Sequence, residues 1–245
     1  MRSMNNHSTV APGTSTVKRL VVLVSGSGTN LQAIIDCIEA GSLPNCEISA
    51  VISNRPNAFA LTRAQQHGIQ ATCLDHTAFS SRAAYDQALA DLVAKSSPDF
   101  IILAGFMRIL TPSFIEPFIG KIVNIHPSLL PKHKGLHTHR SALEQGDHQH
   151  GCSVHFVTVD LDSGPILAQA SFVISEALHA APHDAESPEQ LLKQQVQQLE
   201  YQLYPATIRW LVQDRFRWDL DNNRLYFDEK PLPLSGKQLE KVAIA

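Results

Sequence analysis

The chain has 245 residues, of which 44% are hydrophobic and 18% are charged, and its formal net charge at pH 7 is −3. This length allows one α/β domain or two small ones, with enough apolar material for a sizeable core. The slight negative charge and the absence of a lysine- and arginine-rich run argue against nucleic acid as the main partner. A local site could still oppose the net charge and bind an anionic ligand.

The cysteines and the N-terminal segment bear on the compartment. The four cysteines lie far apart and form no CxxC pair, which favours reduced thiols in a cytoplasmic protein over a disulfide framework. No apolar run is long enough to predict a membrane span. Residues 1–17 are rich in serine, threonine and asparagine without the apolar stretch of a signal peptide. We expect a disordered tail over 1–17 and a single domain over 18–245.

Apolar runs alternate with helical periodicity along the first half of the chain. Arg19–Val24 is continuously apolar from Leu20 onward, which is typical of a strand buried on both faces. Apolar residues then recur at helical spacing from Leu31 to Ile38. The same reasoning predicts further strands at 47–53, 69–74, 99–104 and 121–125, and helices at 58–67 and 80–95.

The second half of the chain continues with two strands, a long helix and a hairpin. The strands are predicted at Gly151–Val159 and Pro165–Ile174, the helix at Ser187–Leu211, and the hairpin at Arg215–Asp228. His179–Pro188 is expected to be a flexible loop. Because strands alternate with helices, we predict an α/β fold: a Rossmann-like, mostly parallel twisted sheet with helices on both faces and a short C-terminal hairpin.

The segment Lys121–Pro131, with the sequence KIVNIHPSLLP, is the most informative stretch. Residues two apart in a strand share a face, so Asn124 and His126 point into the same space, and a proline follows directly. An amide donor beside a titratable ring suits the stabilisation of an oxyanion together with proton transfer. Asp162, in a later turn, is a candidate third partner, although Asp-Ser-Gly-Pro is also ordinary turn chemistry. The pattern predicts a catalytic site.

The glycine-containing loop Ser25–Asn30 stands between the first strand and the first helix. Free backbone N–H groups at such a position can hold a phosphate. The loop lacks the third glycine and the acidic residue of a dinucleotide fingerprint, and it lacks the ending of a P-loop. A tight turn without a ligand remains the alternative.

Seven of the twelve histidines fall between residues 126 and 155. They lack the HExxH spacing, and no carboxylate or cysteine cluster accompanies them, so we expect no metal site. We interpret His148 and His150 as solvated loop residues. His137 and His139 are expected to orient a loop near the site.

The segment Ala104–Leu110 directly follows a predicted parallel strand. Open α/β sheets bind ligands in the crevice beyond such strand ends. A flat heteroaromatic ring could lie on Met107 and Ile109 while the loop backbone contacts its edge. The alternative is a helix start that packs under the sheet.

Taken together, these segments resemble the folate-dependent phosphoribosylglycinamide (glycinamide ribonucleotide) formyltransferases of de novo purine biosynthesis. The similarity runs from about residue 19 to residue 212. It is carried, in the family's order, by residues 24–33, 98–110, 121–139, 153–156 and 162–165. Two departures are the segment Lys132–Gly135, in which Lys134 stands where the family often has proline, and the His179–Pro188 loop, which looks long.

The resemblance implies the formyltransferase fold and a role for each matching side chain. The residues that correspond to the catalytic trio are Asn124, His126 and Asp162. Those that correspond to the ribonucleotide site are Gly28, Thr29, Asn30 and Glu200. Those that correspond to contacts with the formyl-folate are Arg82, Met107, Arg108, Ile109, Leu110 and Asn124.

The implied enzyme moves the formyl group of 10-formyltetrahydrofolate to the glycine amine of phosphoribosylglycinamide. The amine attacks directly, Asn124 and His126 stabilise the tetrahedral oxyanion, and Asp162 assists proton transfer. Neither a metal nor a covalent intermediate is required. The implied partners are small molecules, not nucleic acid or membrane, and the implied state is a cytoplasmic monomer or homodimer.

Three other classes remain open at this point. A formyl-tetrahydrofolate hydrolase has a similar Asn/His/Asp set, but that family carries an N-terminal regulatory domain and tends to place histidine where Pro127 stands. A methionyl-tRNA formyltransferase should have a basic C-terminal domain. A non-catalytic phosphometabolite-binding module would keep the Ser25–Asn30 loop and have no need of the trio.

Overall fold

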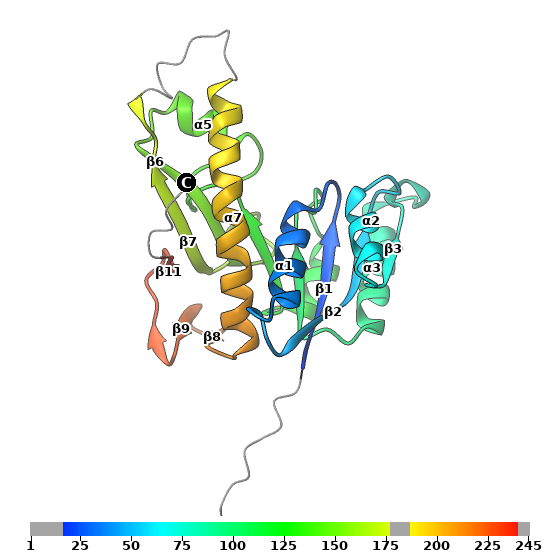
Figure 1. Ribbon diagram of the computed structural model, residues 1–245. Coiled ribbons are helices and arrows are strands. Elements are labelled where there is room, and N and C mark those ends of the chain that lie inside the picture. The colour runs from blue at the N-terminus through cyan, green and yellow to red at the C-terminus, as the bar shows by residue number, and fades with distance from the viewer. Residues whose placement is uncertain (1–16, 177–186, 240–245) are drawn as a thin grey trace, which may run out of the picture.

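The computed structural model describes residues 17–176 and 187–239 (Figure 1). Residues 1–16 of the predicted tail and residues 179–186 of the predicted flexible loop lie outside this range. Within it, no helix is long and apolar enough to cross a membrane.

The centre of the molecule is an eight-stranded sheet with the order β11-β7-β6-β5-β4-β1-β2-β3. Its parallel part consists of β1 (Lys18–Val24), β2 (Cys46–Ser53), β3 (Ala71–Cys73), β4 (Phe100–Leu103) and β5 (Ile122–His126). The next strand, β6 (Gln149–Phe156), is antiparallel to both β5 and β7 (Ile166–Val173). The predicted mostly parallel sheet is confirmed, although β3 is shorter than the predicted strand at 69–74.

Helices cover both faces of the sheet, as alternate residues of β1 show. Leu20, Val22 and Val24 face the core under one helical layer, whereas Val21 and Leu23 face the core under the other. The first layer contains α1 (Thr29–Glu39), α2 (Phe59–Gln66) and the long α7 (Pro188–Val212), which runs beside α1 in Figure 1. The second contains α3 (Arg82–Lys95) and α4 (Pro112–Ile115). Among the described residues, the other short helices are η1 (His76–Ala78), η2 (Glu116–Phe118) and α5 (Thr138–Glu144).

The C-terminal segment forms a second, small sheet. Its strands β8 (Phe216–Asp219) and β9 (Arg224–Phe227) are the predicted hairpin, and β10 (Lys230–Pro231) extends it. The chain then returns to the main sheet, where β11 (Lys237–Gln238) pairs parallel to β7. We did not predict β11, because two residues carry no alternation pattern and their partner strand is distant in sequence.

Hydrogen bonds tie together the loops that follow the parallel strands. The hydroxyl of Ser25, after β1, donates to Asn54 Oδ1 over 2.6 Å and accepts from the N–H of Met107 over 2.8 Å. From α7, the buried hydroxyl of Tyr204 lies 3.1 and 3.0 Å from the carbonyl oxygens of Leu103 and Val123. These contacts fix the carboxyl ends of the strands, where open α/β sheets place their ligands.

Candidate active site

A cavity of about 830 Å³ opens at the carboxyl ends of β4 and β5. On β5, Ile122 packs in the core under α3 and α4, and alternation places Asn124 and His126 on the same face further along. Both side chains line the cavity. The sequence prediction that they share a space therefore agrees with the structure.

The ring of His126 lies between two acceptors and is only 5% exposed. Its Nε2 is 2.8 Å from the carbonyl oxygen of His133, and its Nδ1 is 3.6 Å from Asp162 Oδ2. Nε2–H donates to the His133 carbonyl, whereas the 3.6 Å separation from Asp162 is an ion-pair distance and not a hydrogen bond, so an Nδ1–H beside the carboxylate is not committed. The surroundings thus accommodate the imidazolium form.

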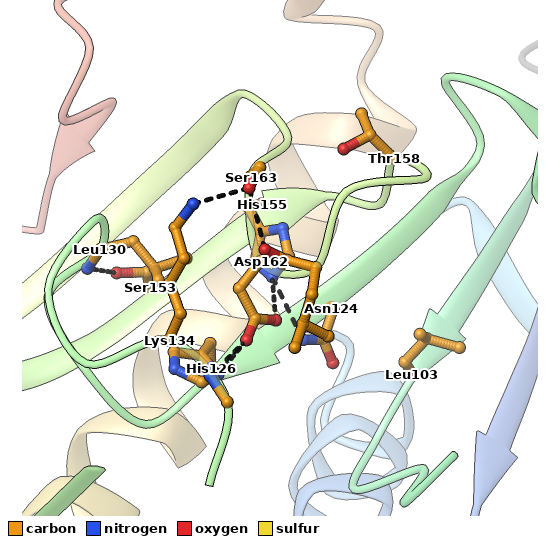
Figure 2. A network of polar contacts seen from close by, with 12 residues as sticks. Leu103, Asn124, His126, Leu130, Lys134, Ser153, His155, Thr158, Asp162 and Ser163 are labelled. Atoms are coloured by element: carbon orange, nitrogen blue, oxygen red, sulfur yellow. Dashed lines mark hydrogen bonds and ion pairs between the residues drawn. The ribbon is translucent and has the colours of Figure 1, made fainter. Parts of the chain in front are cut away.

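Asp162 points into the cavity from the turn between β6 and β7 (Figure 2). Its backbone has φ = +47°, and its Oδ2 accepts a 2.8 Å hydrogen bond from the N–H of Gly135. Two residues later, a Cβ on Gly164 would overlap the carbonyl of Phe156, so the turn packs tightly against β6. The structure therefore brings Asp162 to His126, which distinguishes it from an ordinary solvated turn residue.

His155, which the sequence analysis did not assign to the site, lies directly opposite Asn124 in the β5–β6 register. Its Nδ1 donates to the carbonyl of Phe156 over 2.9 Å, and burial lowers the pKa of His155 to about 4. The neutral ring therefore offers a lone pair at Nε2, which accepts from the amide nitrogen of Asn124 over 3.2 Å. One amide hydrogen of Asn124 is thereby held by His155, and the other remains available to a ligand.

His139 and His150 form a second pair, with His139 Nδ1 3.0 Å from His150 Nε2. Burial lowers the pKa of each to about 4. The prediction that His150 is solvated was wrong, because β6 already starts at Gln149 and turns His150 inward, whereas His148 is exposed as expected. His137 lines the cavity at the start of α5, with φ = +62°. Across the described residues no set of three metal-ligating side chains converges.

The Ser25–Asn30 loop leads into α1, whose N-terminus has no side-chain cap. Gly28 has φ = +73°, and a Cβ there would lie 2.6 Å from the Cβ of Ala60, so glycine is required for both conformation and space. The first N–H groups of α1 are therefore available to an acceptor at this loop.

Two side chains of α7 contact the start of α1. Glu200 Oε2 accepts a 3.0 Å hydrogen bond from the amide of Asn30, and Gln197 Nε2 lies 3.4 Å from Thr29 Oγ1. Burial raises the pKa of Glu200 to about 7, against the opposing effects of the Asn30 hydrogen bond and the charge of Lys193. The structure thus brings Glu200 to the predicted loop. Gln197 was not predicted, because its spacing on a long helix carries no chemical signature.

The residues predicted for the folate mostly line the cavity. Met107 and Ile109 are 61% and 54% exposed, whereas Leu110 is buried. The guanidinium of Arg108 lies 4.5 Å from the centre of the Tyr85 ring, and its Nε is buried without a partner. Arg82, the first residue of α3, also lines the cavity. The helix that follows starts only at Pro112, so the alternative of a helix start within Ala104–Leu110 was wrong.

Lys134, which departs from the family pattern, contacts the turn that carries Asp162 (Figure 2). Its Nζ donates to Ser163 Oγ over 2.6 Å. Next to it, the side chain of His133 is 4% exposed, and its Nε2 lies 2.7 Å from Asp147 Oδ2. The loop whose carbonyl oxygen contacts His126 is therefore anchored at two places.

A family model, curated relatives and solved structures agree on the proteins to which this chain is similar. Residues 18–208 match the model of a family described as formyl transferase. A phosphoribosylglycinamide formyltransferase of Escherichia coli is 45% identical over 217 residues, which cover 89% of this chain and 97% of that protein. A trifunctional purine biosynthetic protein of Bos taurus is 36% identical over 88% of this chain and 20% of its own length. The solved structure of a Coxiella burnetii phosphoribosylglycinamide formyltransferase is 44% identical with a TM-score of 0.82, and the match covers 91% of this chain and 99% of that one.

Proposed function

Because the chain belongs to the formyl transferase family, we propose that it transfers the formyl group of 10-formyltetrahydrofolate to the glycine amine of 5-phosphoribosylglycinamide. The products are formylglycinamide ribonucleotide and tetrahydrofolate. The observation that carries this proposal is the near full-length similarity to phosphoribosylglycinamide formyltransferases. The convergence of Asn124, His126 and Asp162 in one cavity supports it.

Asn124 and His126 are the proposed donors to the developing oxyanion. The amine attacks the formyl carbon, and negative charge moves to the formyl oxygen. The amide hydrogen of Asn124 that His155 does not hold can point to that oxygen. His126 in its imidazolium form is the second donor, through the Nδ1–H that no hydrogen bond holds. A single such donor contributes a rate factor of about 10²–10³.

Asp162 is the proposed proton carrier. The attacking amine loses one proton, and the departing folate nitrogen gains one, so a single proton crosses the site in each turnover. The Asp162 carboxylate lies 3.6 Å from His126 Nδ1, so it also orients that ring. It can assist the transfer directly or through a water molecule.

The two substrates would occupy the two sides of this trio. The phosphate of the ribonucleotide binds the backbone of Gly28, Thr29 and Asn30, and Glu200 contacts donor groups of the ribonucleotide outside its phosphate. The formyl-folate lies against the loop 107–110, where the exposed side chains of Met107 and Ile109 provide an apolar surface. Arg82 and Arg108 offer positive charge to its carboxylates, and Asn124 contacts its reacting end.

The wider proposal concerns the whole protein. Residues 18–245 act as a single formyltransferase domain in the cytoplasm, as a monomer or a homodimer, without a metal. The hydrolase and the phosphometabolite-binding module are the competing functions. The first would release formate, and the second would have no use for the trio.

Absorbance of the folate, measured with and without the ribonucleotide, tests the proposal. We expect turnover that depends strictly on phosphoribosylglycinamide and yields its formylated product. Release of formate in the absence of the ribonucleotide would support a hydrolase instead. No turnover with active substrates would leave the binding module as the better account.

A further inference from the structure

One face of α7 is directed at the Gly28–Asn30 loop. Gln197 and Glu200 lie on this face and contact Thr29 and Asn30. Residues four apart on a helix share a face, so Lys193 stands one turn before Gln197 on the same side. The helix rises about 1.5 Å per residue, which places the Cα atom of Lys193 about 6 Å along the axis from that of Gln197. The long lysine side chain can span this separation.

Lys193 is exposed and lines the cavity. The pKa of His139 is lowered by burial and, to a smaller extent, by the charge of Lys193. The same charge opposes the rise that burial causes in the pKa of Glu200. Lys193 lines the cavity together with His139 and lies one helical turn before Gln197, which contacts the start of α1. Among the described residues, no carboxylate lies within ion-pair distance of Lys193 Nζ. This holds also for Glu189, one turn earlier on the helix.

The Ser25–Asn30 loop contains no basic side chain of its own. Arg63, which contacts this loop, is already engaged: its Nε donates to Ser27 O over 2.8 Å and its Nη1 to Gln32 Oε1 over 3.0 Å. Its guanidinium also lies 4.9 Å from the centre of the Phe59 ring. A phosphate held by backbone amides alone would lack the charge-assisted contact that strengthens such binding.

We propose that Lys193 binds the phosphate group of the ribonucleotide from α7, opposite the backbone amides of residues 28–30. This role rests on the proposed function, because it names a further residue for one substrate of that reaction. Lys193 is then a specificity-determining residue: it favours a phosphorylated substrate over the same compound without its phosphate. It takes no part in the formyl transfer step.

Steady-state kinetics of Lys193→Gln test this role, with Lys121→Gln as the control. Lys121 is exposed at the opposite, amino end of β5, so its substitution removes the same charge far from the cavity. We expect Lys193→Gln to raise the KM for phosphoribosylglycinamide about tenfold, while kcat and the KM for the formyl-folate stay unchanged. Lys193→Arg should restore most of the loss, and Lys121→Gln should resemble the wild type.

The substrate without its phosphate provides the sharper comparison. Wild type and Lys193→Gln should use ribosylglycinamide equally poorly, because the lost contact involves only the phosphate. Equal losses with both substrates, or an unchanged KM for the phosphorylated one, would overturn the proposal.

Binding of ribose 5-phosphate, measured by calorimetry, separates this proposal from the proposed function. We expect Lys193→Gln to weaken that binding about tenfold, and Lys121→Gln to leave it unchanged. If the wild type shows no turnover that depends on the ribonucleotide, the proposed function is overturned. If wild type and Lys193→Gln bind ribose 5-phosphate equally well, the role of Lys193 is overturned.

Discussion

The two proposed ends of the candidate active site, one for the oxyanion and one for the phosphate, use different physical means. The oxyanion end (Asn124, His126, His155 and Asp162) consists of side chains on adjacent strands and one tight turn, and each contacts another member. The phosphate end (residues 28–30 with Lys193, Gln197 and Glu200) consists of the start of α1 and side chains of α7. Pre-oriented side chains suit charge that develops only during reaction, whereas main-chain N–H groups suit an anion that is already present. Substitutions at the first end should therefore lower kcat, and those at the second should change binding.

The largest expected effect is that of His126→Ala. Without the ring, the oxyanion loses one of its two proposed donors, and kcat should fall by about a hundredfold or more. The dissociation constant of the ribonucleotide should stay close to the wild-type value, because the phosphate end is intact. Single-turnover kinetics and calorimetry measure the two quantities separately. A variant with full kcat would remove His126 from the mechanism.

Because His155 positions the amide of Asn124, we expect its substitution to lower kcat less than that of His126 does. His155→Ala frees the amide of Asn124 to rotate, and we expect kcat to fall about tenfold while both KM values remain. In an Asn124→Ala background the same substitution should have little further effect, because the group that His155 orients is already absent. Independent, multiplicative losses in this double-mutant cycle would contradict the coupling.

Glu200 at the phosphate end predicts a pH dependence of stability. Its folded pKa of about 7 lies above its ordinary value of 4.5, so the folded protein holds the proton more tightly between these two pH values. The free energy of unfolding should therefore decrease as the pH rises from 4.5 to 7, by about 1 kcal/mol per pH unit from this group. Glu200→Gln should remove that dependence and be more stable than wild type at pH above 7.

Urea denaturation over this pH range measures the effect, with Glu189→Gln on the same helix as the control. Parallel curves for wild type and Glu200→Gln would show that burial does not hold the proton on this carboxyl group.

Among the substitutions at the oxyanion end, we expect Lys134→Ala to have the smallest effect on stability and on kcat. The contact between Lys134 and Ser163 is exposed, and Asp162 is also held by the Gly135 N–H. The free energy of unfolding should change by less than about 0.5 kcal/mol, with kcat close to wild type. A large drop in kcat would mean that this contact, and not the Gly135 hydrogen bond, orients Asp162.

The strand residues of the site could be predicted because strand periodicity is local. Alternation along β5 places Asn124 and His126 together without any knowledge of the rest of the fold. The sequence identified Asp162 as a candidate, but its position relative to His126 could not be predicted. Turn chemistry does not reveal the direction in which the side chain of a residue with positive φ points. Its approach to His126 depends on the packing of Gly164 against β6.

Other features of the fold and of the site depend on contacts between segments distant in sequence, which a single sequence does not reveal. His155 was not assigned to the site because its contact with Asn124 follows from the β5–β6 register. The misjudged burial of His150 and the missed strand β11 have the same origin, because both depend on where a strand begins and which partner it finds. Lys193 and Gln197 belong to one helical stripe whose meaning appears only when α7 lies beside α1.

The most direct test follows an isotopically labelled formyl group from 10-formyltetrahydrofolate by NMR in wild type and His126→Ala, with phosphoribosylglycinamide present. The account predicts that wild type moves the label quantitatively onto the glycine amine, and that His126→Ala binds both substrates but transfers the label about a hundredfold more slowly. Label that appears as formate in the wild type, or equal transfer rates in the two proteins, would contradict it.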